Sequence, residues 1–223
     1  MTTLLIDLDL EAPPREPVAL SGHQGVRAVV WRGTEPLGQI AFAAAGDVSP
    51  ERLLTEARRQ LGDTPRPALP AVDVAQLPMV TVAICTRDRP GDLEGCLSAL
   101  RAQADSPPHE IVVVDNAPSN ELTRELVGRF PAVRYLVEEM PGLGFARNCA
   151  LREARGEILA FADDDSLPTS GWLLSVATVF ALNPDVGVCG GPIVPAELET
   201  EAQELFELRC GFPQEFDRRV YGD

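Results

Sequence analysis

Five short apolar runs recur at intervals of about 25 residues, and this spacing most limits what the chain can fold into. They span residues 80–85, 111–114, 133–137, 158–161 and 186–189. Between them, as in 93–100 and 122–130, apolar residues stand three or four positions apart, which is typical of amphipathic helices. Strands that alternate with helices form βαβ units, which wind right-handed into a parallel sheet. The sequence therefore predicts an α/β fold with a parallel-type, Rossmann-like sheet.

Polar residues follow four of these predicted strands at the point where each strand ends. They are Thr86 to Arg89, then Asp115 and Asn116, then the loop 141–148, and finally Asp163 to Asp165. Ligands of open parallel sheets bind at the carboxyl ends of the strands. Each group alone could be turn or capping chemistry. Four such groups on one edge favour a binding site.

Three consecutive carboxylates, Asp163, Asp164 and Asp165, leave the apolar run 158–161. Like charges crowd unfavourably unless something positive lies among them, so we expect a metal ion. If the backbone stays extended past Phe161, Asp163 and Asp165 face one way and Asp164 the other. Mg²⁺ takes carboxylate oxygens and completes its shell with water and phosphates. The stretch predicts a metal–diphosphate site; the alternative is a solvated acidic turn that caps the next helix.

Residues 1–62 are expected to form a small α+β module of their own. Apolar and acidic residues alternate in 4–10, and two more strands are predicted at 26–32 and 39–43. A helix should begin after Ser49 and end before Gly62. No catalytic pattern occurs here, so a packing or interaction role is expected.

Four prolines between residues 63 and 78 favour an extended linker. The expected domain division is therefore 1–62, linker 63–78, and a second domain 79–223.

Composition excludes several classes of function. The net charge is -15, which argues against a nucleic-acid-binding surface or a surface for anionic membranes. All 19 basic residues are arginines, and a phosphate-binding P-loop needs a lysine. Five cysteines without a CxxC pair and two histidines disfavour a sulfur-ligated metal and a histidine-based triad. We find no signal peptide and no transmembrane stretch, so the expected location is cytoplasmic or peripheral at the inner face of the membrane.

One competing motif is Gly142-Leu143-Gly144, with Asp163 about 20 positions further on, which loosely follows the dinucleotide-binding fingerprint. Arg147 stands where the third glycine belongs, and the motif does not follow the first predicted strand. A dinucleotide-dependent oxidoreductase is therefore kept as an alternative function.

The polar exits together resemble the family 2 glycosyltransferases of the GT-A fold. The resemblance covers about residues 78–195 and is carried by the motifs at 80–89, 111–116, 142–148 and 161–165, with Pro168, Trp172 and residues 190–192. It implies an inverting, hexosyltransferase-like enzyme that moves a sugar from a nucleoside-diphosphate donor, linked to UDP or GDP, to an acceptor hydroxyl. The acceptor could be a saccharide, a lipid or a peptide.

The resemblance also implies roles for particular residues. The nucleoside pocket would be lined by Thr86, Arg87, Asp88, Asp115 and Asn116, and Arg147 would lie near the uracil or the diphosphate. Asp163 and Asp164 would bind ribose or sugar. Asp165 with Asp163 would hold Mn²⁺ or Mg²⁺ at the position of the DxD motif. Asn116 stands where many members have a second aspartate, which leaves its role in reading the base open.

No candidate for the catalytic base appears before Asp223. Residues 197–210 are expected to form an acidic amphipathic helix, with apolar residues better suited to packing than to catalysis. We expect the base on a later segment and the chain to be truncated at its C-terminal side. A module that keeps the fold without turnover is the third hypothesis.

Overall fold

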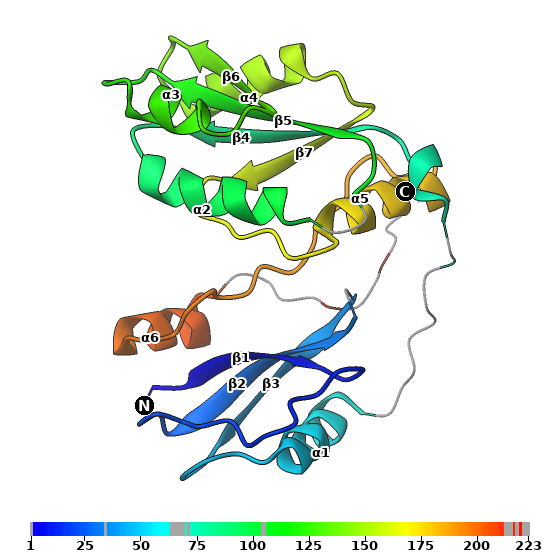
Figure 1. Cartoon of the computed structure of the whole chain (residues 1–223), viewed down its shortest axis with the longest axis vertical. Coiled ribbons are helices and arrows are strands. Elements are labelled where there is room, and N and C mark those ends of the chain that lie inside the picture. Colours follow the sequence, from blue (N-terminus) through cyan, green and yellow to red (C-terminus); the bar gives the residue numbers. More distant parts are fainter. Residues whose placement is uncertain are drawn as a thin grey trace. The chain divides into compact units, whose positions relative to one another are not determined.

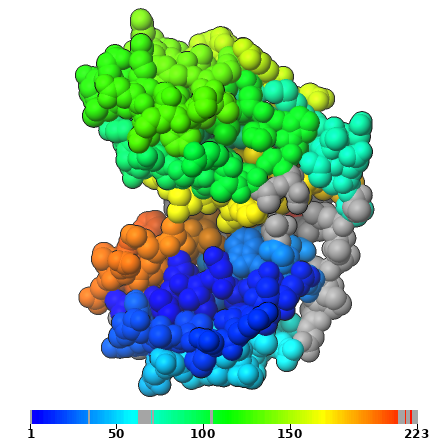
Figure 2. Space-filling view, viewed as in Figure 1, coloured from blue at the N-terminus to red at the C-terminus, as the bar shows by residue number. Residues whose placement is uncertain are grey.

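The computed structural model describes residues 2–33, 35–62, 70, 72–103, 106–211, 216 and 219. Two compact units are present, Met1–Leu69 together with Gly190–Asp223, and Pro70–Cys189, and each can be followed by itself in Figure 1 and Figure 2. Much of the predicted linker, residues 63–69 and 71, lies outside the described residues. The three-part division of the chain stays a prediction. No described helix is long and apolar enough to cross a bilayer.

The second unit contains a four-stranded sheet in the order β6-β5-β4-β7. Its strands are β4 (Val80–Thr86), β5 (His109–Asn116), β6 (Val133–Glu138) and β7 (Ile158–Asp163). All three neighbouring pairs are parallel. The predicted α/β class with a parallel sheet is confirmed.

Helices cover both faces of this sheet. One face packs against α2 (Pro90–Arg101), α3 (Leu122–Val127) and α5 (Trp172–Leu182), and the other against α4 (Leu143–Glu153) (Figure 1). Val113 of β5 belongs to the first core, whereas its neighbours Val112 and Val114 pack with Ala146 of α4. Because both faces are buried, the central strands need continuous apolar runs rather than alternation.

The predicted fifth strand at 186–189 is wrong, because this segment has no strand structure. The side chain of Val188 is 88% exposed, so no core contact favours an extended, paired conformation. Gly187, Gly190 and Gly191 around it also lower strand preference.

The first unit contains β1 (Leu4–Asp9), β2 (Gly25–Arg32), β3 (Glu35–Ala43) and α1 (Pro50–Leu61). Strands β1 and β2 are parallel, and β2 and β3 are antiparallel. The Ser49 side chain caps α1 by accepting from the Arg52 N–H, and Gly62 ends the helix at φ 76°. The three predicted strands and the helix are confirmed, although β3 begins at Glu35 instead of residue 39.

Helix α6 (Glu201–Arg209) belongs to the same unit as β1 to β3. It is shorter than the predicted helix 197–210, because Thr200 and Gln203 form a capping box that fixes its start. Glu204 accepts a hydrogen bond from Thr3, and Glu207 lies 4.0 Å from Arg27.

A short 3₁₀ helix, η1 (Val74–Gln76), precedes β4.

A polar network closes the amino-terminal end of the parallel sheet. The Thr81 hydroxyl donates to Glu110 at 2.8 Å and accepts from the Gly156 N–H at 2.8 Å, while Glu110 pairs with Arg134 at 2.8 Å. A Cβ at Gly156 would lie 2.6 Å from the carbonyl oxygen of Met79 and from the nitrogen of Thr81. The backbone therefore requires glycine at this position.

We predict that Gly156→Ala lowers the free energy of unfolding by about 2 kcal/mol or more, as overpacking against a rigid backbone does. Gly91→Ala is the matched control, because a Cβ there meets no atom within 4 Å. Urea denaturation of both variants measures the effect. Equal midpoints for the two variants would contradict the prediction.

Candidate functional site

The carboxyl edge of the parallel sheet collects most of the predicted site residues. In the register of the sheet, Thr86 of β4 is paired with Asp115 of β5, and Cys85 is paired with Asp163 of β7. Neighbouring strands lie about 4.8 Å apart, so these exits are adjacent. Thr86, Asp115, Asn116 and Asp164 are buried there, whereas Arg87 and Arg147 are exposed.

Asp115 is a buried carboxylate with one oxygen left over. Its Oδ2 accepts from the Tyr135 hydroxyl at 2.8 Å, but its Oδ1 has no hydrogen-bond partner among the described residues. Burial raises the pKa of Asp115, and side-chain hydrogen bonds from Tyr135 and Thr123 oppose that shift. Burial and the hydrogen bond to Asp115 raise the pKa of Tyr135 to about 12, so Tyr135 stays a donor. A buried acceptor oxygen without a donor is unfavourable and calls for an explanation such as a donor that is not part of the described chain.

Asn116 is occupied by the protein itself. Its amide donates to the Met140 carbonyl at 2.7 Å and accepts from the Gly142 N–H at 2.7 Å. These bonds tie the exit of β5 to the loop that begins α4. The predicted contact of Asn116 with a nucleoside stays a prediction, and its observed contacts position the loop.

Asp88 connects two loops at the same edge. Its Oδ1 accepts from the Ser119 N–H at 3.0 Å and from the Asn120 amide at 3.3 Å. Both Asp88 (φ 54°) and Ala117 (φ 48°) adopt the left-handed conformation, which is uncommon for residues other than glycine. Such strain persists where surrounding contacts enforce it, often at functional sites. Arg87 lies beside this link, with its Nε 3.9 Å from Asp88.

The aspartate motif surrounds Arg89, which the sequence placed among the polar residues after the first predicted strand but for which the resemblance implied no role. Asp164 accepts from the Thr86 hydroxyl at 2.7 Å and from Arg89 Nη1 at 2.8 Å. Arg89 Nη2 donates to Asp165 at 3.0 Å. Burial raises the pKa of Asp164, while the Thr86 hydrogen bond and the charge of Arg89 oppose it. The only sequence signal for Arg89 was its place beside Asp88 after the first predicted strand.

The predicted orientation of the three aspartates is corrected by this geometry. Strand β7 ends at Asp163 and a turn follows, so the extended alternation does not continue. Asp164 and Asp165 both contact one cation, the guanidinium of Arg89.

No group of three or more His, Cys, Asp or Glu side chains that could hold a metal occurs in the described ranges. The pair Asp163 and Asp165 as metal ligands therefore stays a prediction. The chemistry of the donors nevertheless fits Mg²⁺ or Mn²⁺. Such ions take hard oxygen ligands, and Mg²⁺ sites commonly use one or two carboxylates plus substrate phosphates.

Arg147 lies in the second turn of α4, the helix that follows β6. Its guanidinium carbon is 5.6 Å from the centre of the Phe161 ring of β7. Within the described part of the chain it has no ion pair with a carboxylate. Arg147 is thus a cation available to an anionic ligand, whereas Arg89 is already paired.

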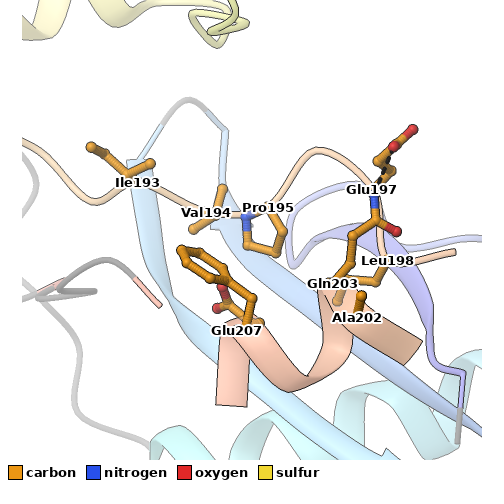
Figure 3. Close-up of a pocket in the computed structure, with 9 residues that line it drawn as sticks. Ile193, Val194, Pro195, Glu197, Leu198, Ala202, Gln203 and Glu207 are labelled. Carbon is orange, nitrogen blue, oxygen red and sulfur yellow. Dashed lines mark hydrogen bonds between the residues drawn. The ribbon is translucent and has the colours of Figure 1, made fainter. Parts of the chain in front are cut away.

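A cavity of about 380 Å³ occurs in the first unit. It is lined by residues 193–195, 197 and 198 and by residues of α6, as Figure 3 shows. None of the predicted site residues contributes to it.

We predict that Asp115→Asn does not lower the free energy of unfolding at pH 7 by more than about 1 kcal/mol. The raised pKa of Asp115 means that its favourable contribution exists below its unfolded pKa, near 3.9, and is lost as pH rises through the folded pKa. Urea midpoints measured from pH 4 to pH 7 should therefore fall with pH in the wild type and less so in the variant.

The control for this experiment is Tyr135→Phe, which removes the hydroxyl that donates to Asp115 Oδ2 and should lower the free energy of unfolding by about 1–3 kcal/mol at pH 7. A large loss of stability in Asp115→Asn would show that the carboxylate is a structural element and not a ligand-facing group.

Comparison with known proteins identifies relatives. The family model described as Glycosyl transferase family 2 matches residues 81–218. Glycosyltransferase AglE of Haloferax volcanii is 31% identical over 116 residues, 49% of this chain and 38% of the relative. Validoxylamine A glucosyltransferase of Streptomyces hygroscopicus subsp. limoneus is 29% identical over 154 residues, 67% of this chain and 34% of the relative. The chain spans less than half the length of these curated relatives.

Two solved structures are also similar. The mannosyltransferase PcManGT of Pyrobaculum calidifontis, in complex with GDP-Man and Mn²⁺, aligns with 62% of this chain and 43% of its own at a TM-score of 0.47 and 31% identity. TarS of S. aureus, residues 1–349, aligns with 52% of this chain and 38% of its own at a TM-score of 0.45 and 24% identity. Because the family model covers more than half of the chain, the chain belongs to glycosyl transferase family 2.

Proposed function

We propose that this chain binds a nucleoside-diphosphate sugar at the carboxyl edge of its parallel sheet, for an inverting, metal-assisted transfer of the sugar to an acceptor hydroxyl. Family membership supports this assignment. The dinucleotide alternative is disfavoured, because Gly142 follows β6 at the edge of the sheet and not the first strand of the parallel sheet.

The observation that carries the proposal is the unpaired Oδ1 of Asp115. A buried carboxylate oxygen without a donor is unfavourable in the free protein, so the site favours a ligand that supplies one. The ring N–H of uracil or guanine is such a donor. Thr86, Asp88 and Asp115 would then form the nucleoside side of the site.

The diphosphate side would be formed by the aspartate motif and by α4. Asp165, with Asp163, would hold the divalent metal, and Arg147 would contribute a fixed positive charge. The bound metal would supply Lewis-acid stabilisation of the negative charge that grows on the departing diphosphate. Asp164 is held by Thr86 and Arg89, so it would present its carboxylate in one orientation to the ribose or sugar hydroxyls.

Four carboxylates at this edge are poorly suited to be the general base. Asp164 and Asp165 pair with Arg89, Asp88 holds the neighbouring loop, and Asp115 is buried. An inverting transfer needs a base on the opposite face of the sugar from the diphosphate. The edge therefore supports donor binding and departure of the diphosphate, and the base is expected on the acceptor side.

We predict that UDP or GDP binds only with Mn²⁺ or Mg²⁺, and that two variants divide the site. Asp115→Ala should weaken uridine or guanosine about 10- to 100-fold, the equivalent of one hydrogen bond to a charged group. Asp165→Ala should leave the nucleoside affinity unchanged and remove the additional affinity of the diphosphate. Calorimetry with nucleoside and nucleotide, each with Mn²⁺ and with EDTA, measures both.

Equal proportional losses of nucleoside and nucleotide affinity in the two variants would refute this division of the site. Undiminished UDP and GDP affinity in EDTA would refute the metal requirement. Asp73→Ala, in the turn before η1, is a control that removes an exposed carboxylate outside the strand exits.

A further inference from the structure

Arg89 contacts three carboxylates at once. Its Nη1 lies 2.8 Å from Asp164, its Nη2 lies 3.0 Å from Asp165, and its Nε lies 3.0 Å from Asp92. The backbone of Arg89 is fixed at the start of α2, where its carbonyl accepts from the Leu93 N–H at 3.2 Å. The fork of an arginine can bridge two carboxylates in a way that a lysine cannot. Arg89 is thus the positive charge that the crowded aspartates require.

The three contacts differ in their surroundings. The Asp164 side chain is 7% exposed and also accepts from Thr86, whereas the Asp165 side chain is 55% exposed. An exposed ion pair contributes little to stability. Arg89 can therefore release Asp165 at small cost while it keeps Asp164 and Asp92 as partners.

Asp165 is the carboxylate expected to bind the metal, and it is also the one whose exposed contact with Arg89 is the easiest to break. A divalent cation at Asp165 has to compete with Arg89 Nη2 for the carboxylate. It is also repelled by the positive charge of the guanidinium, which stays nearby. A diphosphate that arrives with the metal brings negative charge that offsets this repulsion.

We propose that Arg89 is an internal counter-cation of the aspartate motif, which releases Asp165 when metal and diphosphate bind and thereby makes their binding interdependent. This inference rests on the proposed function. In the wild type, Mn²⁺ alone binds weakly, and UDP or GDP strengthens it. By linkage, the metal strengthens nucleotide binding by the same factor. Arg89 is a positioning residue and takes no part in bond breaking.

The test is the affinity for Mn²⁺ alone, without nucleotide, measured by electron paramagnetic resonance of the free ion. Arg89→Gln should bind Mn²⁺ about tenfold tighter than the wild type, because one competing charge nearby is removed. The coupling factor between Mn²⁺ and UDP should fall accordingly. Arg129→Gln is the matched control, since it also removes one exposed arginine that pairs with a carboxylate, Glu94 at 3.1 Å, but makes no ion pair with Asp164 or Asp165 among the described residues, and its Mn²⁺ affinity should change less than about twofold.

A second variant guards against a loss of folding. Arg89→Lys keeps the charge and can hold one carboxylate, so its Mn²⁺ affinity should lie between those of the wild type and Arg89→Gln. Unchanged or weaker Mn²⁺ binding in both Arg89 variants, with wild-type urea midpoints, would overturn the proposal and leave Arg89 a structural clamp.

The nucleotide titration separates this inference from the proposed function. If the wild type binds Mn²⁺ with UDP or GDP but the Arg89 variants show no tighter Mn²⁺ binding, only the role of Arg89 falls. If no form of the protein binds Mn²⁺ while the nucleotide still binds, the counter-cation role and the metal requirement fall together. Absence of any nucleotide binding overturns the proposed function itself.

Discussion

Burial of both faces of the parallel sheet is the constraint on which the site depends. Val112, Val113 and Val114 pack alternately against helices on opposite faces, so no polar side chain is accommodated in the middle of β5. Polarity can begin only where the strand leaves the core, at Asp115. The same holds for β4 at Thr86 and for β7 at Asp163. Parallel pairing then brings these exits to one edge, where side chains distant in sequence meet.

The negative charge at this edge is compensated only in part, and the group that lacks a partner indicates where a ligand could bind. Asp164 and Asp165 share Arg89, which makes the aspartate motif tolerable in the free protein. Asp115 accepts a hydrogen bond from Tyr135 at its Oδ2, while its buried Oδ1 has no hydrogen-bond partner among the described residues. Together with the left-handed backbone at Asp88 and Ala117, this arrangement sacrifices some stability for a preformed edge, as functional sites commonly do.

The family match and the compact units divide the chain differently. The match extends from residue 81 to residue 218, whereas the second unit ends at Cys189, and Gly190–Asp223 belongs with the N-terminal strands. Helix α6 contacts that unit through Glu204 and Glu207. Residues that the family model treats as one region thus contribute to both units of this chain.

Local sequence patterns determined the elements of this protein. The spacing of apolar runs predicted the parallel sheet, and Ser49, Pro50 and Gly62 predicted both ends of α1, because periodicity and capping depend on neighbouring residues. The carboxyl edge as the place of the polar residues followed from the same pattern. The apolar run 186–189 misled the prediction, because whether a short run becomes a strand depends on the core available to bury it.

Only the tertiary structure decided which polar groups are already occupied. Arg89 is separated from Asp164 and Asp165 by 75 and 76 positions, and no local pattern links them. The amide of Asn116 is taken by the loop before α4, and Tyr135 reaches Asp115 from the adjacent strand. Hydrogen bonds between side chains depend on distances of a few tenths of an ångström across paired strands. The sequence therefore predicted where the site lies, and the fold decided which of its atoms are still available to a ligand.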